Sequence, residues 1–199
     1  GNNVDAHLDR NDDNVADLPR PAGNPSRVFD FPLDLASAPA TYGEAATVQL
    51  FYWNNWMHDA LYQLGFTEAA GNFQADNFNR GGVAHDAVLA EVQDGLSLND
   101  GRHFNNANMS VPPDGFAPRM QMYVFNGASP ARDGALDAQI VLHEYTHGLT
   151  SRLVGGGAGI DALQTAGLAE GWSDFYALAL LAGRAGRARP AAGVGGGYA

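Results

Sequence analysis

Two histidines four residues apart, His143 and His147, have the spacing in this sequence that most directly suggests chemistry. On an α-helix, positions i and i+4 lie on the same face one turn apart, so both imidazoles can reach one zinc ion. Glu144 follows the first histidine and points beside the metal rather than onto it. Its carboxylate can take a proton from a water molecule and hand it to a leaving amine. The apolar residues 140–142 and Leu149 support a helix here.

A catalytic zinc ion takes three protein ligands and keeps a fourth position for water, so the two histidines alone are an incomplete site. Glu170, on the next expected helix, is the best third ligand. Asp174 lies one turn beyond it on the same face, where a carboxylate can accept the far N–H of a ligand histidine. The alternative interpretation is that Glu170 and Asp174 form a solvated acidic face of that helix.

Five stretches of this sequence resemble the fungalysin family of secreted zinc metalloendopeptidases. The stretch HEYTHGLTSRL is followed by a glycine-rich loop and then GLAEGWSDFYAL. Upstream, NNWMHDALYQLGFTEAAGNFQADNFNRGG and NNANMSVPPDGFAPRMQMYVFNG are similar to fungalysin sequence, as is the opening GNNVDAHLDRND. The resemblance covers residues 1–182, and it places the chain in the thermolysin-like group, in which the third ligand is a glutamate on a later helix.

The resemblance implies roles for particular residues. His143, His147 and Glu170 would bind the zinc ion, Glu144 would be the general base, and Asp174 would support His143. It also implies that Asn106 and Ala107 belong to an edge strand that pairs with the substrate backbone. A purely structural strand beside the cleft is the alternative for those two residues. Family members are secreted, act on peptide or protein substrates, and are made with a signal peptide and an inhibitory propeptide.

The resemblance implies an α+β fold in two lobes. Residues 1–153 would form an N-terminal, thermolysin-like lobe with the HExxH helix, and 154–182 the glycine loop and the first helix of a helical C-terminal lobe. Residues 183–199 are a tail of glycine, alanine and arginine that we expect to be disordered. The family's second lobe continues further and is expected to supply the oxyanion donor, so the chain looks truncated.

This departure keeps alternatives to an active endopeptidase open. One is a truncated remnant that binds zinc without turnover. Another is a zinc aminopeptidase built on the same ligand set. Turnover of an internally quenched peptide, abolished by a chelator, would exclude the remnant. Cleavage of a peptide with a blocked N-terminus would exclude the aminopeptidase.

Three helices are expected to position the chemistry: Tyr42–Leu64, Leu136–Leu153 and Leu168–Leu181. In the first, an apolar stripe recurs at helical spacing, with a capping box of Thr41 and Glu44 before it and Gly65 as its stop. The stripe consists of Leu50, Trp53, Met57, Leu61 and Leu64.

Strands are expected at Val88–Val92 and, from its alternation, at Arg119–Phe125. Residues 1 to 40 are polar and proline-rich and indicate irregular, mostly surface structure. His58 and Asp59 are interpreted as a partly buried polar pair that braces a neighbouring loop. Three other histidines, His7, His85 and His103, are interpreted as ordinary surface or hydrogen-bonded residues.

An acidic cluster near the N-terminus could bind calcium through hard oxygen ligands, although it lacks the full EF-hand spacing and a solvated loop is the alternative. It consists of Asp9, Asn11, Asp12 and Asp13.

Composition excludes several other chemistries. Cysteine is absent, which excludes disulfides and thiolate sites. All 11 basic residues are arginine, so a lysine Schiff base is excluded. The net charge of −11 argues against nucleic-acid partners and against docking on an anionic membrane. No run approaches the length of apolar sequence that crosses a bilayer.

Overall fold

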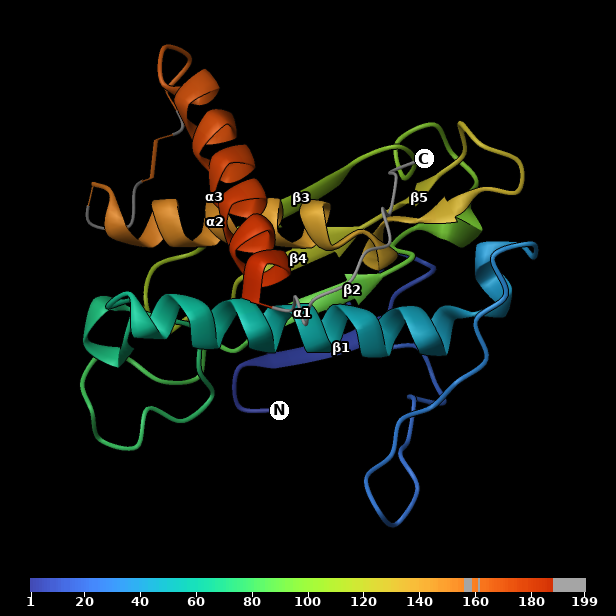
Figure 1. The fold of residues 1–199 in the computed structure, drawn as a ribbon, viewed down its shortest axis with the longest axis horizontal. Coiled ribbons are helices and arrows are strands. Elements are labelled where there is room, and N and C mark those ends of the chain that lie inside the picture. Colours follow the sequence, from blue (N-terminus) through green and yellow to red (C-terminus); the bar gives the residue numbers. More distant parts are fainter. Residues whose placement is uncertain (156–158, 161, 188–199) are drawn as a thin grey trace.

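A mixed four-stranded sheet lies at the centre of the protein (Figure 1). The computed structural model describes residues 1–155, 159–160 and 162–187. The strands, in their order across the sheet, are β1 (Val4–Leu8), β2 (Val88–Val92), β4 (Arg119–Met122) and β3 (Ala107–Ser110). β1, β2 and β4 run parallel, and β3 is an antiparallel edge strand that pairs with β4.

Two helices, α1 (Gly43–Gln63) and α2 (Ala138–Leu153), pack against one face of this sheet and against each other. The strands turn every second side chain to that face, so their alternating apolar residues meet the apolar stripes of the helices. The shared core contains Val4, Leu8, Val88, Ala90, Val92, Met120 and Met122 from the strands, and Leu50, Met57, Val141, Leu142 and Tyr145 from the helices.

A third helix, α3 (Ala166–Arg187), crosses α2 steeply and packs against it (Figure 1). A small second sheet joins β5 (Val124–Phe125) to β6 (Arg132–Asp133). Four short 3₁₀ turns complete the described structure: Pro39–Thr41, Glu68–Ala70, Leu96–Leu98 and Gly134–Leu136. Helices and a mixed sheet in one unit give an α+β architecture.

The first helix is confirmed to within one residue at each end, but two details of it were wrong. No side chain caps its N-terminus, because the Thr41 hydroxyl donates to the carbonyl of Ala38 instead. Leu64 is 68% exposed, since the helix ends at Gln63 and the chain turns away at Gly65, whose φ is +105°. The other four residues of the stripe are buried.

The expectation of irregular surface structure over the first 40 residues was wrong for Val4–Leu8. This segment is β1, a strand with a buried apolar side. Its partner is β2, far along the chain, so local composition carried little information about the pairing. His7 consequently lies in a strand and is buried, whereas His85 is exposed, as expected.

The other expected elements are confirmed with shifted ends. The strand expected over Arg119–Phe125 is divided into β4 and β5, and α2 begins at Ala138 with Asp137 as its N-cap. Helix α3 continues to Arg187, so the expectation of disorder was wrong for 183–187. Arg184 packs over the ring of Trp53 in α1, and this contact supports the end of the helix. The rest of the expected tail, 188–199, lies outside the described residues. Among the described helices, none is both long enough and apolar enough to cross a membrane.

Candidate metal centre

Three side chains expected to bind one metal ion come together where α2 meets α3. The Nε2 atoms of His143 and His147 lie 3.0 Å apart. The Oε2 atom of Glu170 lies 3.1 Å from Nε2 of His143 and 3.5 Å from Nε2 of His147. The three donor atoms therefore form a nearly equilateral triangle.

This triangle fits a zinc ion. Ligand atoms at about 2.0–2.1 Å from tetrahedral zinc are separated from one another by roughly 3.3 Å, which matches the three observed distances. The donor set of two imidazoles and one carboxylate is also a zinc set. The backbone supports the arrangement, because a helix places His143 and His147 on one face and the packing of α3 on α2 brings Glu170 to them.

Asp174 supports His143 from the far side of the ring. Its Oδ1 lies 2.8 Å from Nδ1 of His143. An ionised carboxylate can only accept, so this contact suits a proton on Nδ1, the tautomer that leaves the lone pair of Nε2 for a metal ion. The side chains of Glu170 and Asp174 are 62% and 71% exposed, so this helix face is solvated, yet both carboxylates contact the histidine.

Glu144 lies beside the triangle and is buried. Burial, and to a smaller extent the charge of Glu170, raises the pKa of Glu144 to about 7, while His143 opposes that rise. Glu144 and His143 both line the two hollows that adjoin the candidate centre. The carboxyl group is thus held next to the three candidate ligands without belonging to their triangle.

Asn106 and Ala107 line the same two hollows as His143 and Glu144. Ala107 is the first residue of β3, whose outer edge is not paired with another strand of the sheet. An unpaired strand edge presents backbone N–H and C=O groups to whatever enters the hollow. The structure therefore brings together every residue that the sequence singled out for the zinc site and its substrate strand.

Two further polar residues line the hollow that contains His143, His147 and Glu170, and the sequence did not single them out. They are Asn108 from β3 and Ser151 from α2. Nothing in their type or spacing distinguishes them, since an asparagine in a strand and a serine late in a helix are common. Only their position in space assigns them to this hollow.

An α+β architecture and a cluster of two histidines and a glutamate that could hold a metal ion, on an HExxH helix and the next helix, are the features typical of a metallopeptidase. The chain matches the family described as Fungalysin metallopeptidase (M36) over residues 1–198. It therefore belongs to the fungalysin family of metallopeptidases.

Curated fungal proteins are similar to this chain. It is 46% identical over 186 residues to an extracellular metalloproteinase of Pyrenophora tritici-repentis, covering 90% of this chain and 27% of that protein. It is 47% identical over 161 residues to a probable extracellular metalloproteinase 4 of Arthroderma benhamiae, covering 79% of this chain and 24% of that protein. It is also 47% identical over 161 residues to an extracellular metalloproteinase 3 of Trichophyton soudanense, covering 79% of this chain and 40% of that protein. The chain spans about a quarter of the length of the first two relatives.

Proposed function

We propose that this chain carries the catalytic centre of a secreted, zinc-dependent endopeptidase that hydrolyses peptide bonds in extracellular proteins. The triangle of His143 Nε2, His147 Nε2 and Glu170 Oε2, with sides of 3.0–3.5 Å, is the observation that carries the proposal. Family membership and the relatives named extracellular metalloproteinases support it. Residues 1–153 would form a thermolysin-like lobe and α3 the start of a second, helical lobe.

His143, His147 and Glu170 would hold the zinc ion, with Asp174 fixing the tautomer of His143. Bound zinc supplies Lewis-acid chemistry: it polarises a carbonyl group and lowers the pKa of water. These four residues have no other part in the reaction. Their task is to keep the lone pairs directed at one point.

Glu144 would be the general base. Its carboxylate accepts a proton from the attacking water and later donates that proton to the nitrogen of the departing amine. Its burial excludes bulk water, which would otherwise compete for the proton. Its place beside His143 in the lining of both hollows puts it within the cleft that a scissile bond would enter.

The substrate would lie along the open edge of β3. An extended peptide that adds to this edge forms backbone hydrogen bonds near Asn106 and Ala107. Such contacts hold any peptide irrespective of its side chains. They would also place a bond in the middle of a chain at Glu144, as an endopeptidase requires.

The substitution Glu144→Gln tests the assignment directly. We expect the purified protein to keep one zinc ion per chain and to lose hydrolysis of an internally quenched peptide, because an amide cannot act as the base. Glu44→Gln is the matched control, since Glu44 is exposed in the first turn of α1 and should leave both quantities unchanged. Full hydrolysis by Glu144→Gln would contradict the assignment.

The peptide should carry blocks at both ends. An endopeptidase cleaves it, whereas an aminopeptidase needs a free N-terminus and cannot. Failure of the zinc-loaded protein to cleave any peptide, with zinc binding intact, would identify a zinc-binding protein without turnover.

A further inference from the structure

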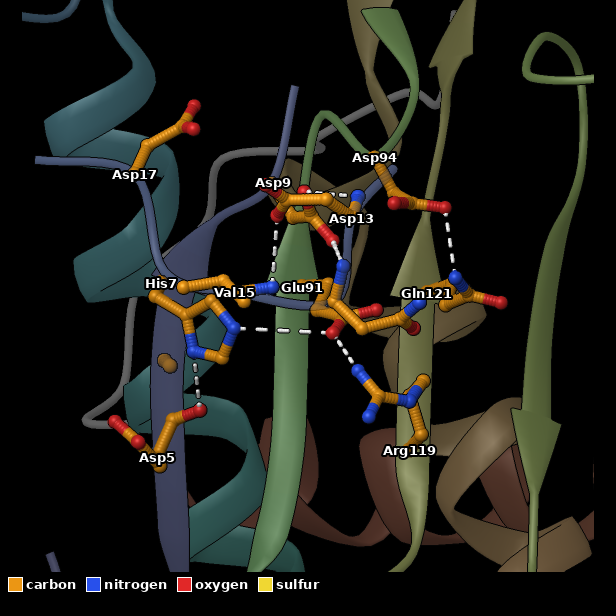
Figure 2. A network of polar contacts seen from close by, with 12 residues as sticks. Asp5, His7, Asp9, Asp13, Val15, Asp17, Glu91, Asp94, Arg119 and Gln121 are labelled. Atoms are coloured by element: carbon orange, nitrogen blue, oxygen red, sulfur yellow. Dashed lines mark hydrogen bonds and ion pairs between the residues drawn. The ribbon is translucent and has the colours of Figure 1, made fainter. Parts of the chain in front are cut away.

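A second group of carboxylates, away from the candidate metal centre, is buried at the carboxyl ends of β1 and β2 (Figure 2). Asp9 follows β1, Glu91 lies in β2, and Asp94 follows β2. All three are fully buried, and one oxygen from each lies within 4.8 Å of the others. We call these three residues the buried triad.

The hydrogen bonds of the triad leave two of its oxygens without partners. Asp9 accepts from the backbone N–H groups of Asp13 and Asn14. Asp94 accepts from Gln121 through Oδ2, but its Oδ1 is buried and has no hydrogen-bond partner among the described residues.

Glu91 is in the same situation. One of its oxygens, Oε1, pairs with Arg119 and faces His7 at 3.8 Å. Its Oε2 is buried without a hydrogen-bond partner in the described part of the chain. A buried, unpartnered carboxylate oxygen is costly because it has lost its hydration and gained nothing in exchange.

The charge of the triad is also poorly balanced. Arg119 pairs with Glu91, but neither Asp9 nor Asp94 forms an ion pair with an arginine among the described residues. The sheet therefore holds more negative charge at this point than the protein itself compensates.

We propose that the buried triad binds one calcium ion. A donor set made only of carboxylate oxygens suits a hard cation, and calcium binds oxygen at about 2.3–2.6 Å. Three oxygens within 4.8 Å of one another lie at most about 2.8 Å from a common centre, so small side-chain shifts bring all three to the distance of a calcium–oxygen bond. Magnesium demands a tighter octahedron and keeps several waters, which a fully buried site does not favour.

Nearby histidines do not turn this site into a zinc site. His103 is engaged at both ring nitrogens, by Asp12 at 3.3 Å and by Asp100 at 2.7 Å. His7 lies on the far side of Glu91 and is not among the residues whose donor atoms gather with the triad. Neither imidazole therefore belongs to the triad, although the donor atoms of His103 and Asp12 gather with that of Asp94 in an adjoining group.

The residues of the N-terminal acidic loop have different roles in this calcium site. The amide of Asn11 donates to Asp13, whose carboxylate also accepts from the backbone N–H of Val15. These two residues stabilise the loop by themselves. Asp9 is the fully buried aspartate of the loop, and its backbone carbonyl accepts from Gly95 in the segment after β2, whereas Asp12 is partly exposed and contacts His103. Calcium at the triad would therefore tie the two loops together.

The experiment measures calcium binding to the purified protein with zinc kept saturating, so that the candidate zinc centre stays filled. Equilibrium dialysis with radioactive calcium gives the stoichiometry, and the melting temperature is recorded with and without calcium. We expect one calcium ion per chain and a higher melting temperature with calcium, because the ion binds the folded state.

Asp94→Asn should weaken calcium binding at least tenfold and remove the calcium-dependent rise in melting temperature. Two matched controls should bind calcium as the unmodified protein does: Asp13→Asn, in the exposed part of the loop, and Asp30→Asn, an exposed aspartate elsewhere. If Asp94→Asn does not fold, a second measurement is made on the unmodified protein. Terbium takes the place of calcium, and its luminescence is excited through a nearby tyrosine. Tyr123 lies close enough to feel the charge of Asp94, so Tyr123→Phe should reduce that luminescence while calcium still binds.

Absence of calcium binding to the unmodified protein would overturn the proposal. So would undiminished binding by Asp94→Asn, full terbium luminescence from Tyr123→Phe, or a loss caused by Asp13→Asn alone, which would point to the exposed loop. Tighter binding of a second zinc ion than of calcium would likewise overturn it.

Discussion

Oδ1 of Asp174 accepts a hydrogen bond from Nδ1 of His143 at 2.8 Å, and this contact links α3 to the back of a proposed ligand on α2. Both the proposed third ligand, Glu170, and the residue that would orient the first therefore come from the same helix. Any shift of α3 relative to α2 would disturb two features of the metal centre at once.

Asp174→Asn should lower zinc affinity by about 10–100-fold, because a neutral amide is a weaker acceptor for the imidazole N–H and leaves Nε2 less basic. Competition with a chelator measures the affinity. Asp30→Asn, which removes an exposed carboxylate far from the site, should leave it unchanged. Equal affinities for Asp174→Asn and the unmodified protein would show that this contact does not support the metal centre.

The C-terminal end of α2 is held by a buried ion pair between Arg152 and Asp86, at 2.8 Å. The same guanidinium donates to the backbone carbonyls of Gly71, Pro112 and Phe116. Arg152→Met should reduce the free energy of unfolding by about 3–5 kcal/mol, because it leaves the carboxylate buried and uncompensated. Urea denaturation measures this change.

Two further variants test that reason. Arg102→Met removes an exposed arginine and should leave stability almost unchanged. Adding Asp86→Asn to Arg152→Met should recover part of the loss, since the unpaired charge is then gone. A double variant less stable than Arg152→Met would argue against a charge effect.

Gly148 and Gly171 are a matched pair of helical glycines with opposite expectations. A Cβ at Gly148 would lie 2.8 Å from the ring of Phe73 and 3.1 Å from Met109, whereas a Cβ at Gly171 would meet nothing within 4 Å. Gly148→Ala should therefore lower the melting temperature. Gly171→Ala should raise it, because alanine is favoured over glycine in helices by up to about 1 kcal/mol. The same direction for both variants would be the contradictory result.

Asp133 gives a pH dependence with a definite sign. Burial raises the pKa of Asp133 to about 6, although Gln93 and the N–H of Ala135 oppose the rise. The folded state binds this proton more tightly than the unfolded state, so its contribution to stability is full below about pH 4 and is lost as the pH rises through 6. The loss amounts to roughly 3 kcal/mol.

Asp133→Asn removes this titration. The difference in free energy of unfolding between Asp133→Asn and the unmodified protein should shift in favour of the variant from pH 4 to pH 7, as measured by urea denaturation at each pH. Asp30→Asn should show no such trend over the upper part of this range. A difference that stays constant with pH would mean that Asp133 titrates normally in the folded protein.

Most of the candidate metal centre could be predicted from the spacing of residues within single helices. His143, Glu144 and His147 share one helix, so helical geometry alone brings them together. The pairing of Glu170 with Asp174 follows in the same way on α3. The strand Val88–Val92 was also predictable, because its residues form a compact apolar run.

Only the tertiary structure decided which distant elements meet. β1 lies in a segment whose composition indicates a surface loop, and it becomes a strand because β2, more than 80 residues later, supplies its hydrogen bonds. That pairing also buries Asp9 with Glu91 and Asp94. The sequence by itself determined the chemistry available on each helix, since helical contacts are local. The buried triad forms only in the tertiary structure, because parallel strands that are far apart in the sequence bring its three carboxylates together. Long connections join these strands, and no local pattern encodes their pairing.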